Sequence, residues 1–303
     1  MTVTLPMCSV NFMDTSMSVE EHAIADRIQE LKDQLGDDLL ILGHHYQRDS
    51  IVMHADFLGD SFMLSQKAAA SDAKYIVFCG VHFMAESADI LTSDDQSVIL
   101  PNLRAGCSMA DMATLSEVEV AWETLLEESG LADPIDRPNP EEPAGDGEAF
   151  LVPVTYMNSS ADLKDFVGRH GGVVCTSSNA EGVLTWAFER AGANGAVLFF
   201  PDQHLGRNTG LAMGISADRM PTWTPGIGAM GSLDEARIVL WHGFCSVHKR
   251  FTPQQIADFR AKHPGAVVVV HPECPRETVE QADANGSTQY IRNFVEQQPA
   301  GTS

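Results

Sequence analysis

The sequence predicts an α/β fold with parallel sheets, and three observations support this class. Short apolar runs without alternation are typical of parallel strands that are buried on both faces. Helical stretches lie between several of these runs, which indicates βαβ units. A segment rich in Pro, Gly and acidic residues, within 131–148, is typical of an exposed loop or linker. The apolar runs are residues 39–42, 75–78, 97–100, 149–154, 171–174, 196–200, 237–241 and 266–270.

A weak internal repeat divides the chain into three related units of roughly 100 residues, an ordinary domain size. In each unit the first strand ends in two polar positions, and a hydroxyl cluster follows the second strand. We expect three similar α/β/α domains, with the third incomplete because only its first two elements precede Ser303. The polar pairs are His44 and Tyr46, Tyr156 and Asn158, and His271 and Glu273, and the clusters are residues 59–61, 176–178 and 286–288.

The repeat also predicts where the units begin and end. We expect an N-terminal extension and helix, two complete α/β units joined by the acidic linker, and a truncated third unit. The extension is residues 1–38, the first unit 39–130, the linker 131–148, the second unit 149–262 and the third unit 263–303.

Charge and hydropathy exclude several classes of function. The 303 residues carry 19 basic and 42 acidic side chains, a formal charge of −23, so nucleic acid and anionic membranes are not expected partners. No apolar run approaches the roughly 20 residues of a membrane helix. Residues 1–20 lack the basic start and apolar stretch of a secretory signal. We therefore expect a cytoplasmic protein.

The six cysteines are widely spaced, and the absence of a Cys-x-x-Cys pair excludes a compact zinc finger. In a reducing compartment disulfides are not expected. Cys8 and Cys79 are interpreted as small buried residues. Cys107 and Cys245 instead occupy equivalent loops that contain Gly and Ser. Thiolates from separate units suit an iron–sulfur cluster or another soft metal, and a cubane held by three of them leaves one iron open as a Lewis acid.

The three hydroxyl clusters allow two interpretations. Ser61, Ser178 and Thr288 each precede a helical stretch, so each could cap its helix, with Glu181 completing a capping box after Ser178. Each helix start is also a ready anion site, through its N–H groups and dipole. Three of them together could bind a ligand with several anionic groups.

Histidine and carboxyl side chains at a strand exit indicate acid–base chemistry. His271 and Glu273 directly follow four valines and are suited to proton transfer. Tyr46 is a candidate proton donor beside a metal or cation. His44, His204 and His248 also lie in polar motifs, although a lone histidine is more often structural or exposed.

Nine motifs, in order from about residue 40 to residue 290, make the chain resemble the quinolinate synthase family. A Pro-rich insertion before the second unit resembles the longer form of that family. The motifs are GHHYQRDSIVMHADFLGDSFMLSQKAA, GVHFMAESADIL, LPNLRAGCSMADM, VTYMNSSADLK, VCTSSNA, FFPDQHLGRNTG, HGFCSVH, VVHPECP and ADANGST.

The resemblance implies a reaction and a cofactor. The family condenses iminoaspartate with dihydroxyacetone phosphate to give quinolinate, phosphate and water, in the synthesis of NAD. Its fold is three similar α/β domains around a pseudo-threefold axis, with the active site at the centre. Its cofactor is a 4Fe-4S cluster held by three cysteines, whose open iron acts as a Lewis acid. Functional coupling to an enzyme that produces iminoaspartate is a further expectation.

The family's functional residues match specific positions of this chain. By motif, Cys107 and Cys245 match two cluster ligands. Tyr46, Glu273 and His271 are the predicted catalytic residues. The predicted substrate-binding residues are His44, Ser61, Tyr156, Asn158, Ser177 and Thr288.

One departure from the family pattern leaves alternatives open. The family's third cluster cysteine lies in a C-terminal segment, and no equivalent motif follows Thr288. Cys274 lies in a different motif and is not assigned as a ligand. The chain is then either a piece of a longer enzyme or a shortened paralogue that binds a dicarboxylate or phosphate without catalysis. A cluster enzyme of the diphthamide-forming type is disfavoured by the HPEC and PDQHLG motifs.

Overall fold

The computed structural model describes residues 18–299, 301 and 302. Cys8, interpreted above as a buried residue, and most of the predicted N-terminal extension before Val19 lie outside the described residues. The chain divides into two compact units. The first contains the described residues up to Gly80 together with Ala88–Asn102, and the second contains Val81–Ser87 and the described residues from Leu103 onward.

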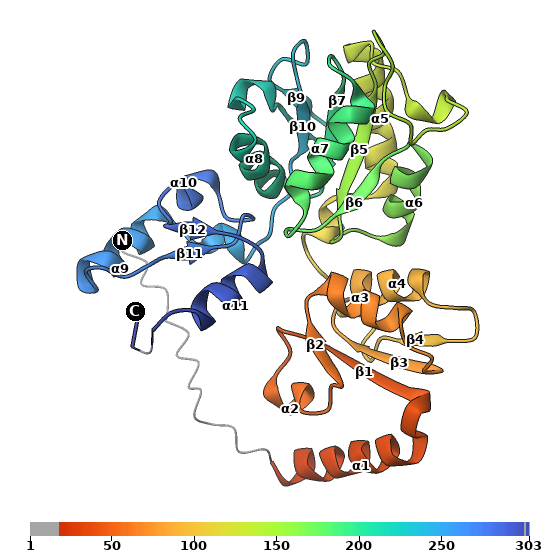
Figure 1. Ribbon diagram of the computed structural model, residues 1–303, viewed down its shortest axis with the longest axis vertical. Helices are drawn as coiled ribbons and strands as arrows, with labels where there is room; N and C mark the ends of the chain where they lie inside the picture. The colour runs from red at the N-terminus through yellow and green to blue at the C-terminus, as the bar shows by residue number, and fades with distance from the viewer. Residues whose placement is uncertain (1–17, 300, 303) are drawn as a thin grey trace. The chain divides into compact units, whose positions relative to one another are not determined.

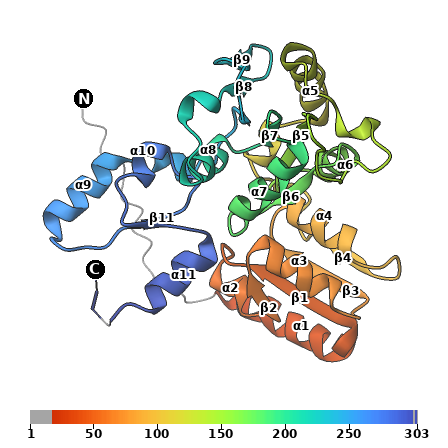
Figure 2. The same ribbon diagram turned by 45° about the horizontal axis from the view of Figure 1, so that its top comes forward.

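The first unit is built on a four-stranded parallel sheet with the order β2-β1-β3-β4 (Figure 1). The central strand β1 is buried along most of its length, as its apolar run predicts. The helix α3 packs against this strand, with Leu64 and Ala68 buried (Figure 2). The strands are β1 (Leu39–His44), β2 (Phe57–Gly59), β3 (Tyr75–Cys79) and β4 (Ser97–Ile99), and the helices are α1 (Val19–Leu35), α2 (Asp49–Val52), α3 (Ser61–Ala69) and α4 (His82–Leu91), whose residues are shared between the two units.

The second unit contains a six-stranded sheet with the order β6-β5-β7-β10-β8-β9. All neighbouring strands are parallel except β8 and β9, which form an antiparallel hairpin. Every residue of β5, β7 and β10 is buried, which explains why β7 and β10 are uninterrupted apolar runs and why β5 begins as one, before Thr155. The strands are β5 (Leu151–Tyr156), β6 (Val173–Cys175), β7 (Ala196–Phe200), β8 (Thr222–Thr224), β9 (Gly228–Met230) and β10 (Ile238–Trp241).

Helices cover this sheet and complete the core. Trp122 of α5 packs edge to face on Phe166 of α6, with ring centroids 5.6 Å apart, and both belong to a buried cluster with β5, β7 and β10. The other two helices of this unit's large sheet, α7 and α8, pack side by side (Figures 1 and 2). The helices are α5 (Leu115–Ser129), α6 (Ala161–Arg169), α7 (Ala180–Ala191) and α8 (Gln203–Ala212).

A third, two-stranded parallel sheet pairs β11 (Val269–Val270) with β12 (Ala284–Asn285). The predicted strand 266–270 is therefore shorter than its valine run suggests. Val267 is exposed to 40%, although Ala266 before it is buried, so the run is not packed along its whole length. The neighbouring helices are α9 (Pro253–Lys262), α10 (Arg276–Val279) and α11 (Thr288–Glu296).

The prediction of an α/β fold with parallel sheets is confirmed. The strand order of the first sheet recurs in β6-β5-β7-β10, and β11-β12 pairs the equivalents of its first two strands. The registers also correspond, because His44 pairs with Gly59 and Tyr156 pairs with Cys175. Three equivalent domains around a pseudo-threefold axis, and the predicted domain boundaries, stay predictions.

The acidic segment 131–148 lies within the second unit. Ala132 forms a parallel bridge with Phe150, and the N–H of Ala144 donates to the carbonyl of Glu189 at 3.1 Å. The segment therefore folds back onto β5 and α7. No described helix is long and apolar enough to cross a membrane.

Candidate active site

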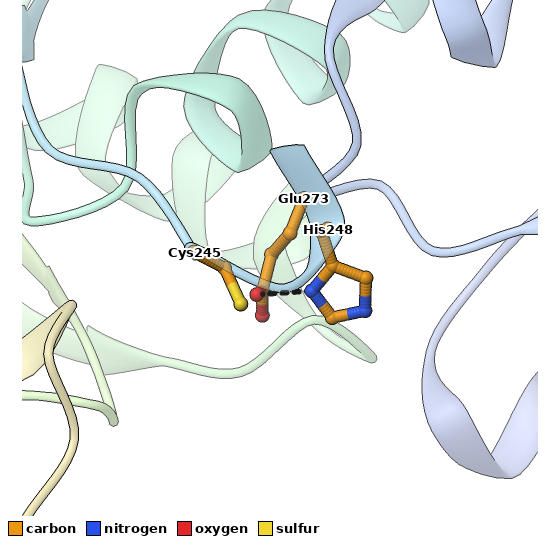
Figure 3. A group of neighbouring side chains, drawn as sticks. All are labelled: Cys245, His248 and Glu273. Atoms are coloured by element: carbon orange, nitrogen blue, oxygen red, sulfur yellow. Dashed lines mark hydrogen bonds and ion pairs between the residues drawn. The ribbon is translucent and has the colours of Figure 1, made fainter. Parts of the chain in front are cut away.

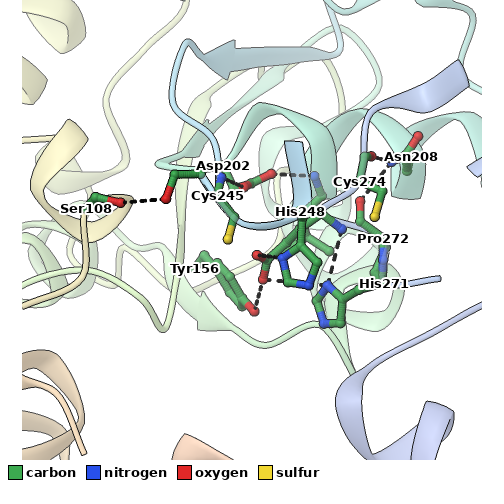
Figure 4. A network of polar contacts seen from close by, with 12 residues as sticks. Ser108, Tyr156, Asp202, Asn208, Cys245, His248, His271, Pro272 and Cys274 are labelled. Carbon is green, nitrogen blue, oxygen red and sulfur yellow. Dashed lines mark hydrogen bonds and ion pairs between the residues drawn. The ribbon is translucent and has the colours of Figure 1, made fainter. Parts of the chain in front are cut away.

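Glu273 is the centre of the candidate site, in the loop that follows β11. It is 4% exposed, and a buried carboxylate requires hydrogen-bond donors. The hydroxyl of Tyr156, at the end of β5, donates to Oε1 at 2.7 Å (Figure 4). Nδ1 of His248 lies 2.9 Å from Oε2 (Figure 3). The end of β5 and the 3-10 helix His248–Arg250, far apart in sequence, therefore hold one carboxyl group.

The surroundings of Glu273 keep it ionised. Burial raises its pKa, but the hydrogen bond from His248 and the nearby imidazoles outweigh burial, and the net effect lowers the pKa. The pKa of Tyr156 is raised by burial and by the charge of Glu273, so the phenol stays protonated and acts as a donor. The arrangement is a carboxylate that can accept a proton, held in place by two donors.

Two imidazoles with different charges stack beside this carboxylate. The rings of His248 and His271 are 4.7 Å apart at an angle of 19°. Burial disfavours the charge on His248, but hydrogen bonds to Cys245 and Glu273 raise its pKa to about 10. Burial lowers the pKa of His271 to about 4. One ring is therefore a cation and the other a neutral base at neutral pH.

The loops that carry the two predicted cluster cysteines meet in the second unit. The hydroxyls of Ser108 and Ser246, each one residue after its cysteine, lie 3.2 Å apart (Figure 4). Burial raises the pKa of Cys107, and the neighbouring Cys245 and Glu273 side chains add to that increase. The ligand atoms of Cys245, His248 and Glu273 all lie within 4.8 Å of one another (Figure 3). The thiol of Cys245, a carboxyl group and an imidazole therefore lie together.

Asp202 positions the Cys245 loop and was not assigned from the sequence. Its carboxyl group is fully buried, directly after β7 and a cis Phe200–Pro201 peptide bond. Oδ1 accepts the N–H of Leu205 at 2.7 Å, which caps α8, and Oδ2 accepts the N–H of Cys245 at 3.1 Å. Burial and the charge of Glu273 raise the pKa of Asp202 to about 8.

The other described cysteines are not part of the Cys245, His248 and Glu273 group. Cys79 is half-buried in β3, and Cys175 is buried at the end of β6. Cys274 is buried, and burial raises its pKa to about 11. Its carbonyl accepts a hydrogen bond from Asn208 at 2.9 Å, so this loop is anchored to α8 through its backbone.

Three of the predicted site residues belong to the first unit. His44 ends β1 and is buried, and burial together with His45 lowers its pKa to about 4. Tyr46 follows two residues later, with its ring 4.4 Å from that of His44, and is 69% exposed. Ser61 is the first residue of α3 and is half-buried. The unit thus presents all three at the carboxyl end of adjacent strands.

The predicted helix caps are wrong by one residue. The residue that caps α3 is Asp60, which accepts the N–H of Met63, and the residue that caps α11 is Ser287. The capping box predicted for Ser178 and Glu181 is not formed. Ser61 and Thr288 already have helical geometry, so their hydroxyls are not used as caps.

The start of α7 differs from the other two. Its N-cap is Asn179, whose side chain makes no cap hydrogen bond and instead accepts the N–H of Thr176 at 2.7 Å. Ser177 precedes this helix start and is half-buried, and it interacts with the Tyr156 hydroxyl. Asn158 is half-buried after β5.

The remaining histidine of the polar motifs lies on a helix. His204 is the second residue of α8, and burial lowers its pKa to about 4. His204 is not part of the Cys245, His248 and Glu273 group.

Comparison with known proteins identifies the family. The family model described as quinolinate synthetase A protein matches residues 26–303. The chain belongs to this family. The resemblance noted in the sequence is therefore confirmed.

Relatives in the family are similar over nearly all of this chain but extend further. The quinolinate synthase of Corynebacterium glutamicum is 56% identical over 282 residues, covering 91% of this chain and 66% of that protein. That of a Nocardioides species is 52% identical over 290 residues, covering 93% of this chain and 69% of that protein. That of Acidobacterium capsulatum is 50% identical over 295 residues, covering 96% of this chain and 74% of that protein. The chain thus spans about two thirds to three quarters of the length of these relatives.

Proposed function

We propose that this chain carries the quinolinate synthase reaction, the condensation of iminoaspartate with dihydroxyacetone phosphate to quinolinate, phosphate and water in NAD biosynthesis. Family membership supports the reaction. The observation that carries the proposal is Glu273, a buried carboxylate bonded to Tyr156 and His248 beside Cys245. This arrangement places a carboxylate that can accept a proton, that of Glu273, close to a thiol that can hold a metal, that of Cys245.

Cys107 and Cys245 fit as two ligands of the family's 4Fe-4S cluster. Their loops meet through the Ser108–Ser246 contact, and both thiols are half-buried rather than sealed in the core. We assign the third ligand of the family to none of the described residues. When bound, a cluster with an open iron supplies Lewis acidity toward a substrate oxygen or nitrogen.

In the proposed reaction, this chain's own residues move protons and hold anions. Glu273 accepts a proton from the condensing substrates, and Tyr156 and His248 keep its two oxygens in place. His271, a neutral base, is the second candidate for proton transfer, and Tyr46 of the first unit is the third. General acid–base groups of this kind contribute about 10²–10⁴-fold to rate.

The substrates are anions, and hydroxyl groups at helix starts are suited to them. We propose that Ser61, Ser177 and Thr288 bind carboxylate or phosphate oxygens, with His44 and Asn158 as further polar contacts. Asn179 does not cap α7 with its side chain, so the N–H groups of this helix start can serve an anion.

The acid–base role is tested by Glu273→Gln in a cluster-loaded chain extended to the length of its relatives. We expect quinolinate formation to fall about 10²–10⁴-fold while folding is retained. Tyr46→Phe and Tyr156→Phe report on the proposed partners. The matched control is Glu277→Gln, an exposed carboxyl four residues away. Near-normal turnover of Glu273→Gln would show that its assigned role is wrong.

The cluster assignment has its own test, anaerobic reconstitution followed by iron and sulfide analysis. An extended chain should hold about four of each, as a cubane requires. Cys107→Ser or Cys245→Ser should lower both contents strongly, whereas Cys79→Ser should not. An extended chain that binds substrate analogues but no cluster would favour the non-catalytic binding protein.

The anion sites are tested by calorimetry with a dicarboxylate analogue. A lost hydrogen bond to a charged group costs about 1.5–3 kcal/mol, so Ser61→Ala, Ser177→Ala and Thr288→Ala should each weaken binding. Ser178→Ala is the control, because this exposed hydroxyl neither caps α7 nor belongs to the proposed set. Unchanged affinity in all three variants would refute the assignment.

A further inference from the structure

The group formed by Cys245, His248 and Glu273 has a geometry that goes beyond the assignment of one thiol to a cluster. Its sulfur, nitrogen and oxygen ligand atoms lie within 4.8 Å of one another (Figure 3). The cysteine and histidine are separated by two residues, a short spacing of the kind that structural metal sites use. The third side chain comes from the loop after β11.

We propose that these three side chains form a zinc site when Cys245 is not engaged by a cluster. Zinc prefers thiolate, imidazole and carboxylate ligands at about 2.0–2.3 Å and takes four of them in a tetrahedron. Three protein ligands leave a fourth position for water. In such a tetrahedron the ligand atoms lie about 3.3–3.6 Å apart. The Nδ1–Oε2 pair, at 2.9 Å, would therefore open slightly, and any pair nearer the 4.8 Å limit would close.

The contact between two of the ligands marks where the ion would lie. Nδ1 of His248 and Oε2 of Glu273 are 2.9 Å apart (Figure 3). A divalent cation at this place would bind both atoms and the sulfur of Cys245 at once, in place of the hydrogen bond between them. The ion would also offset the two negative ligands.

Neighbouring groups hold each ligand in position, as in built metal sites. The hydroxyl of Tyr156 donates to Oε1 of Glu273 at 2.7 Å, which leaves the other oxygen for the ion (Figure 4). Asp202 accepts the N–H of Cys245, and the ring of His271 stacks on His248. All of these residues belong to the second unit.

The ligand types determine which ion is favoured. A thiolate and an imidazole select against magnesium and calcium, which prefer oxygen ligands. Zinc also binds such sites more tightly than ferrous iron, following the usual order of divalent metals. The consequence is that zinc would occupy a cluster ligand and slow the loading of iron.

The first test is a zinc titration of the metal-free 303-residue chain against a chromophoric chelator. We expect one zinc per chain, and Cys245→Ser, His248→Gln and Glu273→Gln should each weaken binding on the order of 100-fold, since even losses outside the first ligands cost about 10–100-fold. His242→Gln is the matched control, an exposed histidine close by in sequence, and should bind zinc normally. Normal zinc affinity in His248→Gln and Glu273→Gln would overturn the proposal.

The second test begins with the wild-type chain, whose folding no substitution disturbs. X-ray absorption of the zinc-loaded wild-type chain should show one sulfur at about 2.3 Å and the remaining ligands as nitrogen or oxygen at about 2.0–2.2 Å. Two sulfurs, from Cys107 and Cys245, would replace the proposed site with a bis-thiolate site. Loss of zinc binding in Cys107→Ser together with normal binding in His248→Gln would likewise indicate the bis-thiolate site and overturn the proposal.

The third test measures competition. One equivalent of zinc added to the extended chain before anaerobic reconstitution should lower its iron uptake at least tenfold, and a chelator should restore the uptake, whereas magnesium should have no effect. Undiminished iron uptake by zinc-loaded chain would contradict the competition. The zinc measurements use no substrate and no cluster, so they stand or fall independently of quinolinate formation.

Discussion

Replacing Asp202 with alanine should destabilise the chain more than loss of an ordinary surface carboxyl group. The side chain is fully buried and accepts the N–H groups of Leu205 at 2.7 Å and Cys245 at 3.1 Å. Removing it leaves a buried N–H on Leu205 and a half-buried N–H on Cys245 without a partner, and each costs about 1–3 kcal/mol. The expected loss in the free energy of unfolding is therefore about 2–6 kcal/mol. Asp202→Asn keeps one acceptor oxygen and should lose about half as much.

The assay is urea unfolding of the metal-free chain, followed by circular dichroism. With a slope of about 1–3 kcal/mol per molar urea, the midpoint of Asp202→Ala should fall by roughly 1 M or more. Asp146→Ala, an exposed carboxyl in the acidic segment, is the control and should stay within about 0.5 kcal/mol. If Asp202→Ala unfolds at the wild-type midpoint, the two hydrogen bonds do not hold the Cys245 loop, and the positioning argument is wrong.

Three further predictions concern pH, packing and salt. Burial raises the pKa of Asp133, but hydrogen bonds from His170 and two N–H groups outweigh burial and lower the pKa below 3.8 overall. The carboxylate therefore stabilises the fold above pH 3.8, and this stabilisation is lost as the pH falls further. The melting temperature of Asp133→Asn should differ from that of the wild type at pH 7 and converge with it in acid. Gly206→Ala should lower the free energy of unfolding by about 1–3 kcal/mol, because its Cβ would lie 2.6 Å from the side chain of Leu240. Gly182→Ala should raise it by about 0.5–1 kcal/mol in the same urea assay, because its Cβ would lie in open space and alanine is the better helix residue. Raising the ionic strength from about 0.01 M to about 0.15 M shortens the screening length from about 30 to about 8 Å. Because the chain carries a formal charge of −23, this screens its repulsion of a dicarboxylate, and the affinity measured by calorimetry should rise. A steep fall in affinity would mean that a local positive field dominates.

The sheet strands could be predicted because their burial is encoded locally. Residues 196–200 form an apolar run, and all five residues of β7 are buried. The hairpin of β8 and β9 was not predicted. Its strands have three residues each, Thr222–Thr224 and Gly228–Met230, and such short segments carry no readable period.

The candidate site was predictable only in part. Polar residues at strand ends, such as Tyr156 and His271, were found because ligands bind beyond the carboxyl ends of parallel strands. The pairing of Glu273 with His248 could not be found, because the two residues are 25 positions apart and meet only through the fold. Asp202 gave one signal, a Pro-Asp pair directly after a buried strand, but that pattern is equally typical of a helix cap.

The helix caps show why a local pattern can be displaced by one residue. The sequence Ser178-Asn179-Ala180-Glu181 fits a capping box that starts at Ser178, and the structure starts α7 one residue later. The side chain of Asn179 turns back to the N–H and hydroxyl of Thr176, at 2.7 and 3.0 Å, and so does not cap the helix. Because Asn179 bonds to the preceding turn instead of to the helix, the first N–H groups of α7 receive no hydrogen bond from its side chain and can serve a ligand. A departure from the best local capping pattern is therefore an argument for function at this loop.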